Sequence, residues 1–451
     1  PKTLDVNLNP TLDRETTGAH LEFTYSFDNM DFTSITSYTD TDSTRNSDVD
    51  LTTLWFFNTF QPQKMDVTTQ EFRFTSTNDG PLQWIGGLYY MEYVERMRST
   101  LDFGWIVVEG DDPTVGVTVP FATRRDIRSN LAGFANVTYQ MDEWEFSAGL
   151  RVDQWTSDEV ALDIGHAAKK DEIEYIPRLA ISRDVGDGMF YGSIARGFEP
   201  GGFNGIADGA PPVIGPGGEK TLAGYEPEFA LQYELGWKGT FMDGRGSGTV
   251  ALFYSNYEDR QFEFILPNPG GDGLIEGITN VGDSTQMGIE LSASFQATEY
   301  LTLIGAFGYT DAEFDSGTVL VDGTDISGNE PPNIISPSAT LNVNYRRPVM
   351  NNFNFVFDAQ VSYNGETRGG APWDNVMNPS YTVVSLQTGL SNEKWEFMLN
   401  VENLFDEEYY VDLQPFPNLG LDGLTGEGPP NIVIGTWGQP QLITASVSYF
   451  F

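Results

Sequence analysis

The final segment of the chain, Gln439–Phe451, reads QPQLITASVSYFF and ends on two phenylalanines. Successive side chains of an extended strand point to opposite faces. Ile443 and Val447 therefore share one face, whereas Thr444 and Ser446 share the other. In water, a strand with this ending would leave an apolar, unpaired sheet edge. The segment thus favours a strand that closes a β-barrel inside a membrane.

The same alternation recurs from end to end. It is clearest at 20–27, 286–295 and 352–364, where apolar and polar residues take turns. We predict about seventeen such strands, each near the roughly 9–11 residues that a tilted membrane strand requires. Short turns alternate with longer predicted loops, which include the polar stretch 39–50 and the segment 95–128. Short periplasmic turns and long external loops are typical of outer-membrane barrels.

Composition excludes several other classes. The chain has no cysteine, so disulfides, cysteine-ligated zinc and iron–sulfur sites are excluded. No apolar run approaches the roughly 20 residues of a membrane helix. With 24 basic and 65 acidic residues the formal net charge is −41, and nothing would neutralise the phosphates of a nucleic acid. We therefore expect no nucleic-acid partner.

The acidic excess favours a solvated acidic surface over a cation-binding role. The acidic clusters at 40–50 and 311–325 contain no regular calcium-binding loop, so we predict no metal site and no cofactor. The chain opens at PKTLDV, without a charged start and an apolar core. We expect any export signal to have been removed or to lie upstream.

Enzymatic motifs are absent from the sequence. GxSxG, HExxH and Walker-type loops do not occur, and His20 and His166 are the only histidines. Gly197, Gly201 and Gly202 could cradle a phosphate, but a Pro-rich stretch follows them rather than a helix, which favours a turn. We predict that the protein is not an enzyme.

Four segments carry a family resemblance. They are ARGFEPGGFN at 195–204, YEPEFALQYELGWKGTF at 225–241, NVENLFDEEYY at 400–410 and GQPQLITASVSYFF at 438–451. Their order and spacing resemble the TonB-dependent outer-membrane receptors, over essentially the whole chain. The terminal segment lacks the arginine that is usual there.

The resemblance implies that 1–451 is part of one domain, an all-β, transmembrane antiparallel barrel. Family barrels have 22 strands around a plugged lumen, so about five strands and the N-terminal plug are expected to precede Pro1. The plug carries the box that the energy-transducing partner pulls. Neither the plug residues nor the TonB box can be assigned in this sequence.

The function that the resemblance implies is active import across the outer membrane of a Gram-negative cell. The expected partners are outer-membrane lipid, a TonB-type protein acting through the plug, and a scarce bulky solute such as an iron–siderophore complex, cobalamin or an oligosaccharide. A passive porin or an outer-membrane adhesin is the alternative. A soluble β-propeller enzyme or lectin is a third class, which the one-sided alternation disfavours.

Candidate ligand-binding residues fall into two groups. The aromatic candidates are Trp105, Phe203, Trp373, Phe416 and Trp437, although an interfacial girdle explains some of them equally well. The basic candidates are Arg96, Arg98, Arg124 and Arg125. The two longest external stretches, 197–228 and 409–438, offer one cation, Lys220. We therefore favour a neutral or cationic ligand, and an anionic site would be confined to the arginines.

Overall fold

The computed structural model describes residues 8–48, 57–103, 117–162, 166–204, 224–267, 274–320, 323–349, 352–370, 376–417 and 431–451. All regular elements in these ranges are β-strands. None of the described residues forms a helix that is long and apolar enough to cross a membrane.

One antiparallel sheet contains 17 strands, which confirms the predicted number. In chain order they are β1 (Thr11–Ser26), β2 (Met30–Asp48), β3 (Phe57–Ser76), β4 (Leu82–Phe103), β5 (Val117–Met141), β6 (Trp144–Ala161), β7 (His166–Val185), β8 (Gly188–Glu199), β9 (Glu228–Phe241), β10 (Gly246–Glu258), β13 (Ser284–Gln296), β14 (Leu301–Phe314), β15 (Ser338–Pro348), β16 (Asn354–Asn364), β19 (Tyr381–Ser391), β20 (Trp395–Glu402) and β23 (Leu442–Tyr449).

Three two-stranded hairpins complete the described strands. They are β11 (Gln261–Pro267) with β12 (Leu274–Asn280), β17 (Thr367–Arg368) with β18 (Met377–Asn378), and β21 (Tyr410–Pro417) with β22 (Asn431–Trp437). Strand β21 contacts both β18 and β11. β11 follows β10 and β21 follows β20, and β10 and β20 are far apart in the large sheet. The contact between β11 and β21 therefore brings together hairpins that follow distant strands.

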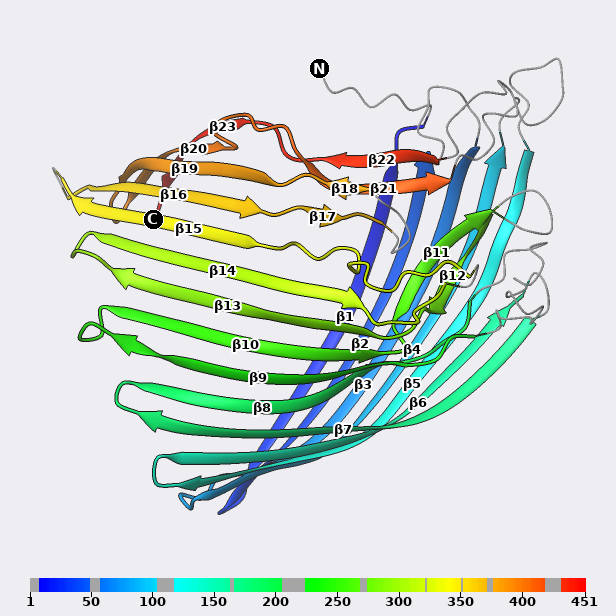
Figure 1. Ribbon diagram of the computed structural model, residues 1–451, viewed down its shortest axis with the longest axis horizontal. Coiled ribbons are helices and arrows are strands. Elements are labelled where there is room, and N and C mark those ends of the chain that lie inside the picture. Colours follow the sequence, from blue (N-terminus) through cyan, green and yellow to red (C-terminus); the bar gives the residue numbers. More distant parts are fainter. Residues whose placement is uncertain are drawn as a thin grey trace.

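The large sheet is a meander in which each strand pairs with the next, and β1 and β23 are its two edges. Figure 1 shows the sheet curved into an open barrel wall, with its short turns along one rim. Several turn residues adopt a left-handed backbone, including Asp142 (φ 52°), Met242 (φ 53°) and Gly244 (φ 80°). Tight turns of this kind join antiparallel strands without splaying them.

The two faces of the sheet differ in chemistry, as the alternation predicts. Large apolar side chains crowd one face, where Leu235 is 65% and Val447 64% exposed. We call this the membrane face. The opposite face is polar: Thr249 Oγ1 lies 2.6 Å from Ser292 Oγ. Segments that follow β8 and β9–β10 pack on this polar face, so it lines the interior, and we call it the lumen face.

Strand length is where the sequence prediction was wrong. β2 to β7 contain 18 to 25 residues each, so the stretch 39–50, predicted as a loop, is strand as far as Asp48. Polar ladders support this extension, since Lys64 Nζ lies 2.9 Å from Asp40 Oδ2. The segment 95–128 likewise contains the ends of β4 and β5, and 409–438 contains β21 and β22.

Candidate functional site

A group of charged side chains, buried carboxylates with partly exposed arginines, lines the lumen face where β4, β5 and β6 extend beyond the apolar rows. We call Glu95, Arg124, Asp126, Arg128 and Glu159 the mouth cluster. Glu95 lies opposite Asp126, and Asp126 lies opposite Glu159. The two arginines sit between these carboxylates: Arg128 Nε is 2.9 Å from Asp126 Oδ2, and Arg124 Nη2 is 3.7 Å from Glu95 Oε1.

The carboxylates of the mouth cluster are desolvated. Glu159 is 5% exposed, and its Oε1 atom has no hydrogen-bond partner. Burial raises the pKa of Glu159 to about 7, against the opposing effect of Arg124. The neighbouring charges of Asp126 and Glu95 add to the increase. Glu159 therefore changes its charge near neutral pH.

A segment after β8 and one before β9 are attached to this wall. Gly202 and Tyr225 form an isolated β-bridge, and the Tyr225 side chain is buried, 7% exposed, with Arg128 beside it. Lys170 on β7 ties the same segment down, because its Nζ lies 2.7 Å from Glu172 Oε1 and 2.6 Å from Glu226 Oε2. The described ends of the segment between β8 and β9, 200–204 and 224–227, thus fold inward over the lumen face.

The hairpin β11–β12 is joined to the same network. Asn204 Nδ2 donates a hydrogen bond to the backbone oxygen of Ile278 (2.7 Å), and Asn204 Oδ1 accepts one from the Ile278 backbone amide (2.6 Å). Asn280 Nδ2 donates to the Glu226 backbone oxygen at 2.9 Å. Asn204 is 8% exposed. These bonds fix the hairpin to the inward-folded segment.

Two of the predicted aromatic residues can be placed with their side chains. The Trp437 ring stacks on Tyr410 with ring centroids 4.1 Å apart, and Phe203 lies against Gly224, where an added Cβ would be 3.1 Å from its ring. Trp105 and Trp373 lie outside the described residues. The backbone of Phe416 belongs to β21, but its side chain is outside the described part.

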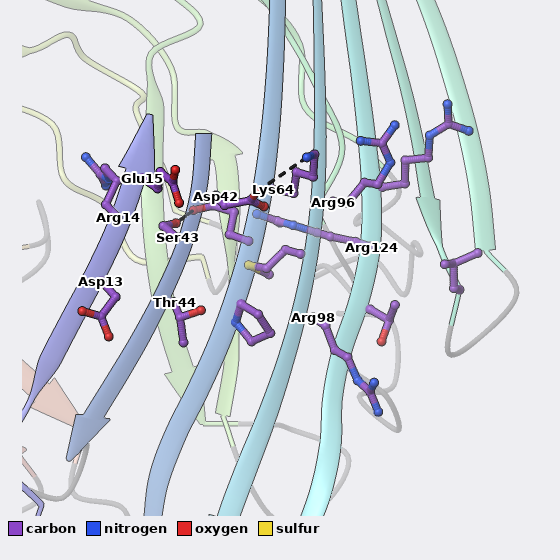
Figure 2. A pocket seen from close by; sticks show the side chains of 16 residues that line it. Asp13, Arg14, Glu15, Asp42, Ser43, Thr44, Lys64, Arg96, Arg98 and Arg124 are labelled. Carbon is purple, nitrogen blue, oxygen red and sulfur yellow. Dashed lines mark hydrogen bonds and ion pairs between the residues drawn. The ribbon is translucent and has the colours of Figure 1, made fainter. Parts of the chain in front are cut away.

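The four predicted arginines come together in the fold but on two faces. Arg96, Arg98 and Arg125 are exposed and belong to the membrane face of their strands, beyond the apolar rows. Arg124 faces the lumen beside Glu95. All four line one groove of about 720 Å³, and Figure 2 labels Arg96, Arg98 and Arg124 in it. Their role in ligand binding stays a prediction.

Sequence reasoning missed most of the mouth cluster. Arg128 belongs to the basic stretch 95–128, to which we confined an anionic site. Glu95, Asp126, Glu159 and Glu172 were not among the candidates, because acidic residues are abundant throughout the chain, and the ion-paired Lys170 was not a candidate either. The two-residue alternation of the strands could have identified these carboxylates. When the alternation is continued beyond the apolar rows, Glu95, Asp126 and Glu159 all fall on the polar face.

A sequence profile described as TonB dependent receptor-like, beta-barrel matches residues 2–404. The chain belongs to this family. Its fold and family are those of outer-membrane receptors and transporters. Among curated proteins it is similar to the metal-pseudopaline receptor CntO of Pseudomonas aeruginosa, with 26% identity over 272 residues, covering 60% of this chain and 36% of that protein.

The chain is also similar to the probable TonB-dependent siderophore receptor PiuA of Acinetobacter baumannii (24% identity, 65% of this chain, 40% of that protein). It thus spans less than half the length of these two relatives. Among solved structures, the ferric yersiniabactin uptake receptor FyuA of Yersinia pestis has a TM-score of 0.76 at 18% identity, covering 98% of this chain and 62% of that chain. This likeness confirms the barrel fold.

Proposed function

We propose that this chain is the barrel of an active importer that moves a metal chelate through the outer membrane, with energy from a TonB-type partner. The observation that supports the proposal best is the inward folding of the external segments onto a polar lumen wall. The bridge between Gly202 and Tyr225 and the bonds of Asn204 hold the described ends of these segments on the lumen side of the wall. A receptor that captures a bulky solute needs a concave site with a few placed polar groups, which these inward-folded segments and the mouth cluster provide.

We further infer that the full-length protein closes this barrel with additional strands around a plug. The unpaired edges β1 and β23 support this inference, because an open edge inside a membrane leaves backbone groups without hydrogen bonds. In such a protein the mouth cluster would lie above the plug, where the two surfaces together hold the ligand.

The charges at the mouth support a neutral or cationic ligand. At the mouth on β5 to β7, each described lumen-facing cation has an acidic neighbour: Arg124 has Glu95, Arg128 has Asp126, and Lys170 has Glu172. An anionic chelate would have to separate these buried carboxylates from their arginines, which is costly because it leaves an uncompensated buried charge. A cationic or neutral chelate can instead accept hydrogen bonds from, or donate them to, the intact pairs.

Transport tests the importer against the porin. Cells that lack their other metal receptors would express the full-length protein, with and without the TonB-type partner, and uptake of radiolabelled metal chelates would be measured against concentration. We expect saturable uptake that disappears without the partner. Uptake that rises linearly with concentration and persists without the partner would instead identify a passive pore.

A matched pair of variants tests the ligand charge. Arg124→Ala removes a lumen-facing cation, and Arg125→Ala removes the adjacent cation on the other face. For a neutral or cationic chelate, we expect Arg124→Ala to change the uptake affinity by less than about tenfold and Arg125→Ala to leave it unchanged. Loss of uptake with Arg124→Ala, and rescue by Arg124→Lys, would identify an anionic ligand.

A further inference from the structure

The segment between β8 and β9 lies against the mouth cluster through its two described ends. We call these ends, 200–204 and 224–227, the bridged segment. The Gly202 amide donates a hydrogen bond to the Tyr225 oxygen at 3.1 Å, and the Tyr225 amide donates one to the Gly202 oxygen at 2.9 Å. The Tyr225 side chain is folded onto Gly202, where an added Cβ would be 2.5 Å from the phenol oxygen. Because glycine allows this close approach, the ring is held at one place over the lumen face.

The wall beneath the bridged segment includes the part of β6 that carries Glu159. Ser157 Oγ donates a hydrogen bond to the Gly201 oxygen at 3.4 Å, and Ser157 is two residues from Glu159 on the same face of β6. Burial raises the pKa of the Tyr225 hydroxyl, and the nearby charge of Glu159 adds to the increase against the effect of Arg128. Tyr225 is therefore close to Glu159, and docking of the bridged segment helps to bury this carboxyl.

The charges of the mouth cluster do not balance when every group is ionised. Its carboxylates are Glu95, Asp126 and Glu159, and its guanidiniums are Arg124 and Arg128. The arginines are nearest to the first two carboxylates, since Arg128 Nε is 2.9 Å from Asp126 Oδ2 and Arg124 Nη2 is 3.7 Å from Glu95 Oε1. Among the described residues none forms an ion pair with Glu159, and its Oε1 atom has no hydrogen-bond partner. One proton on Glu159 makes the cluster neutral.

The elements around Glu159 offer it no spare cation within the described residues. Directly across the β6–β7 ladder, Glu159 faces Ala168. The lysine nearby on β7, Lys170, is held by Glu172 at 2.7 Å and by Glu226 at 2.6 Å. The described titratable and charged groups that face Glu159 are Tyr93 and Glu95 on β4, Arg124, Asp126 and Arg128 on β5, Lys170 and Glu172 on β7, and Tyr225 and Glu226 on the bridged segment. An ionised Glu159 is thus a buried charge without a partner, which is costly.

Protonation of Glu159 removes this cost, and it does so near neutral pH. Burial raises the pKa of Glu159 to about 7, against the opposing effect of Arg124. A glutamate in contact with water has a pKa of about 4.3, so it is ionised over the whole range from pH 6 to pH 8. The docked segment and the proton therefore stabilise each other. Acidic pH favours docking, whereas pH above 7 favours hydration of an ionised Glu159.

We propose that the proton on Glu159 controls the docking of the bridged segment: a neutral Glu159 lets Tyr225 cover the mouth cluster, and an ionised Glu159 releases it. The release would reach the hairpin β11–β12, because Gln261 Nε2 and Asn280 Nδ2 donate hydrogen bonds to the Glu226 backbone oxygen at 3.0 and 2.9 Å. In the importer proposed above, on which this role rests, the mouth cluster is covered at acidic pH and accessible at alkaline pH. Glu159 is a positioning residue, because it acts through the bridged segment.

Hydrogen exchange of the full-length protein in detergent micelles, followed by mass spectrometry, measures the docking. The readout is the protection of the Gly202 and Tyr225 amides, whose hydrogen bonds form the bridge, corrected for the intrinsic exchange rate at each pH. For a carboxyl that is protonated below about pH 7 when covered and ionised when released, we expect this protection to fall about tenfold between pH 6 and pH 8. Amides in the middle of β13 should keep the same corrected protection over this range.

Glu159→Gln is the deciding variant, because glutamine has nearly the same shape and is neutral at every pH. Its bridge should stay protected at pH 8 as at pH 6. Asp158→Asn is the matched control, because Asp158 is the adjacent residue of β6 and faces the other side of the sheet. This control should show the same fall as the parent.

Constant protection in the parent between pH 6 and pH 8, or an equal fall in the Glu159→Gln variant, would overturn the proposal. If the glutamine variant does not fold, the pH profile of the parent and of Asp158→Asn still decides the question. The measurement uses neither a chelate nor the TonB-type partner. The bridge can therefore prove independent of pH while uptake is saturable, and uptake can prove passive while the bridge responds to pH, so the two proposals fail separately.

Discussion

Replacement of Leu291 by arginine tests the assignment of the membrane face. Leu291 lies on β13 and points to the same side as Phe307, its partner on β14. β13 ends at Gln296, beside the short turns, so Leu291 is about 17 Å from that end along the strand. With a tilt near 45° this becomes about 12 Å of depth, which is the middle of an apolar band about 25 Å tall.

At that depth an arginine on the lipid face costs about 2–4 kcal/mol. Ser292→Arg is the matched control, because Ser292 lies at nearly the same depth but faces the lumen. It loses the hydrogen bond to Thr249, which is worth about 1 kcal/mol, and the new guanidinium gains Glu290 as a neighbour on the same face. We expect the Ser292 variant to lose no more than about 1 kcal/mol.

The assay is urea unfolding of the full-length protein from lipid vesicles, followed by tryptophan fluorescence. The two variants and the parent would be compared at the same lipid composition and the same ionic strength. Equal losses of unfolding free energy for Leu291→Arg and Ser292→Arg would refute the reasoning. They would mean that both faces are packed alike, as in a soluble sheet.

Three further outcomes are expected. The free energy of unfolding should fall by about 3 kcal/mol as pH rises from 4.5 to 7, because the folded protein binds the proton of the Glu159 carboxyl more tightly than the unfolded chain does. A pH series of urea unfolding should show this fall for the parent and not for Glu159→Gln. Tyr410→Ala should remove about 1 kcal/mol of stacking on Trp437, so limited proteolysis should cleave the β21–β22 hairpin faster than in the parent. An unchanged cleavage rate would show that the stacked rings do not hold the hairpin. Unboiled protein should migrate differently from boiled protein on gels, and identical migration would contradict a closed barrel.

The sequence was sufficient to predict the membrane-spanning part of the sheet. There the lipid requires an apolar side chain at every second position, so the alternation in a strand such as β13 identifies both its centre and its faces. Leu291 and Ser292 belong to the alternating stretch 286–295, which predicts that they face opposite sides, and the structure confirms this prediction.

Beyond the membrane this constraint disappears. The residues from Thr39 to Asp48 carry no apolar alternation, yet they are strand because cross-strand polar pairs such as Thr16 with Thr41 hold them. The faces of Arg124 and Arg125 could not be read for the same reason. Their position became clear only when the ladder placed Arg125 opposite Arg96 and Arg124 opposite Met97.

The unequal lengths of the strands set the direction in which the barrel opens. β5 has 25 residues and β16 has 11, a difference that amounts to about 30 Å of height for strands tilted near 45°. The upper rim of the described sheet is therefore oblique, high at β5 and low at β16. On the low side, the hairpins β17–β18 and β21–β22 continue beyond the ends of the sheet strands, so short hairpins rather than tall strands form the rim there (Figure 1).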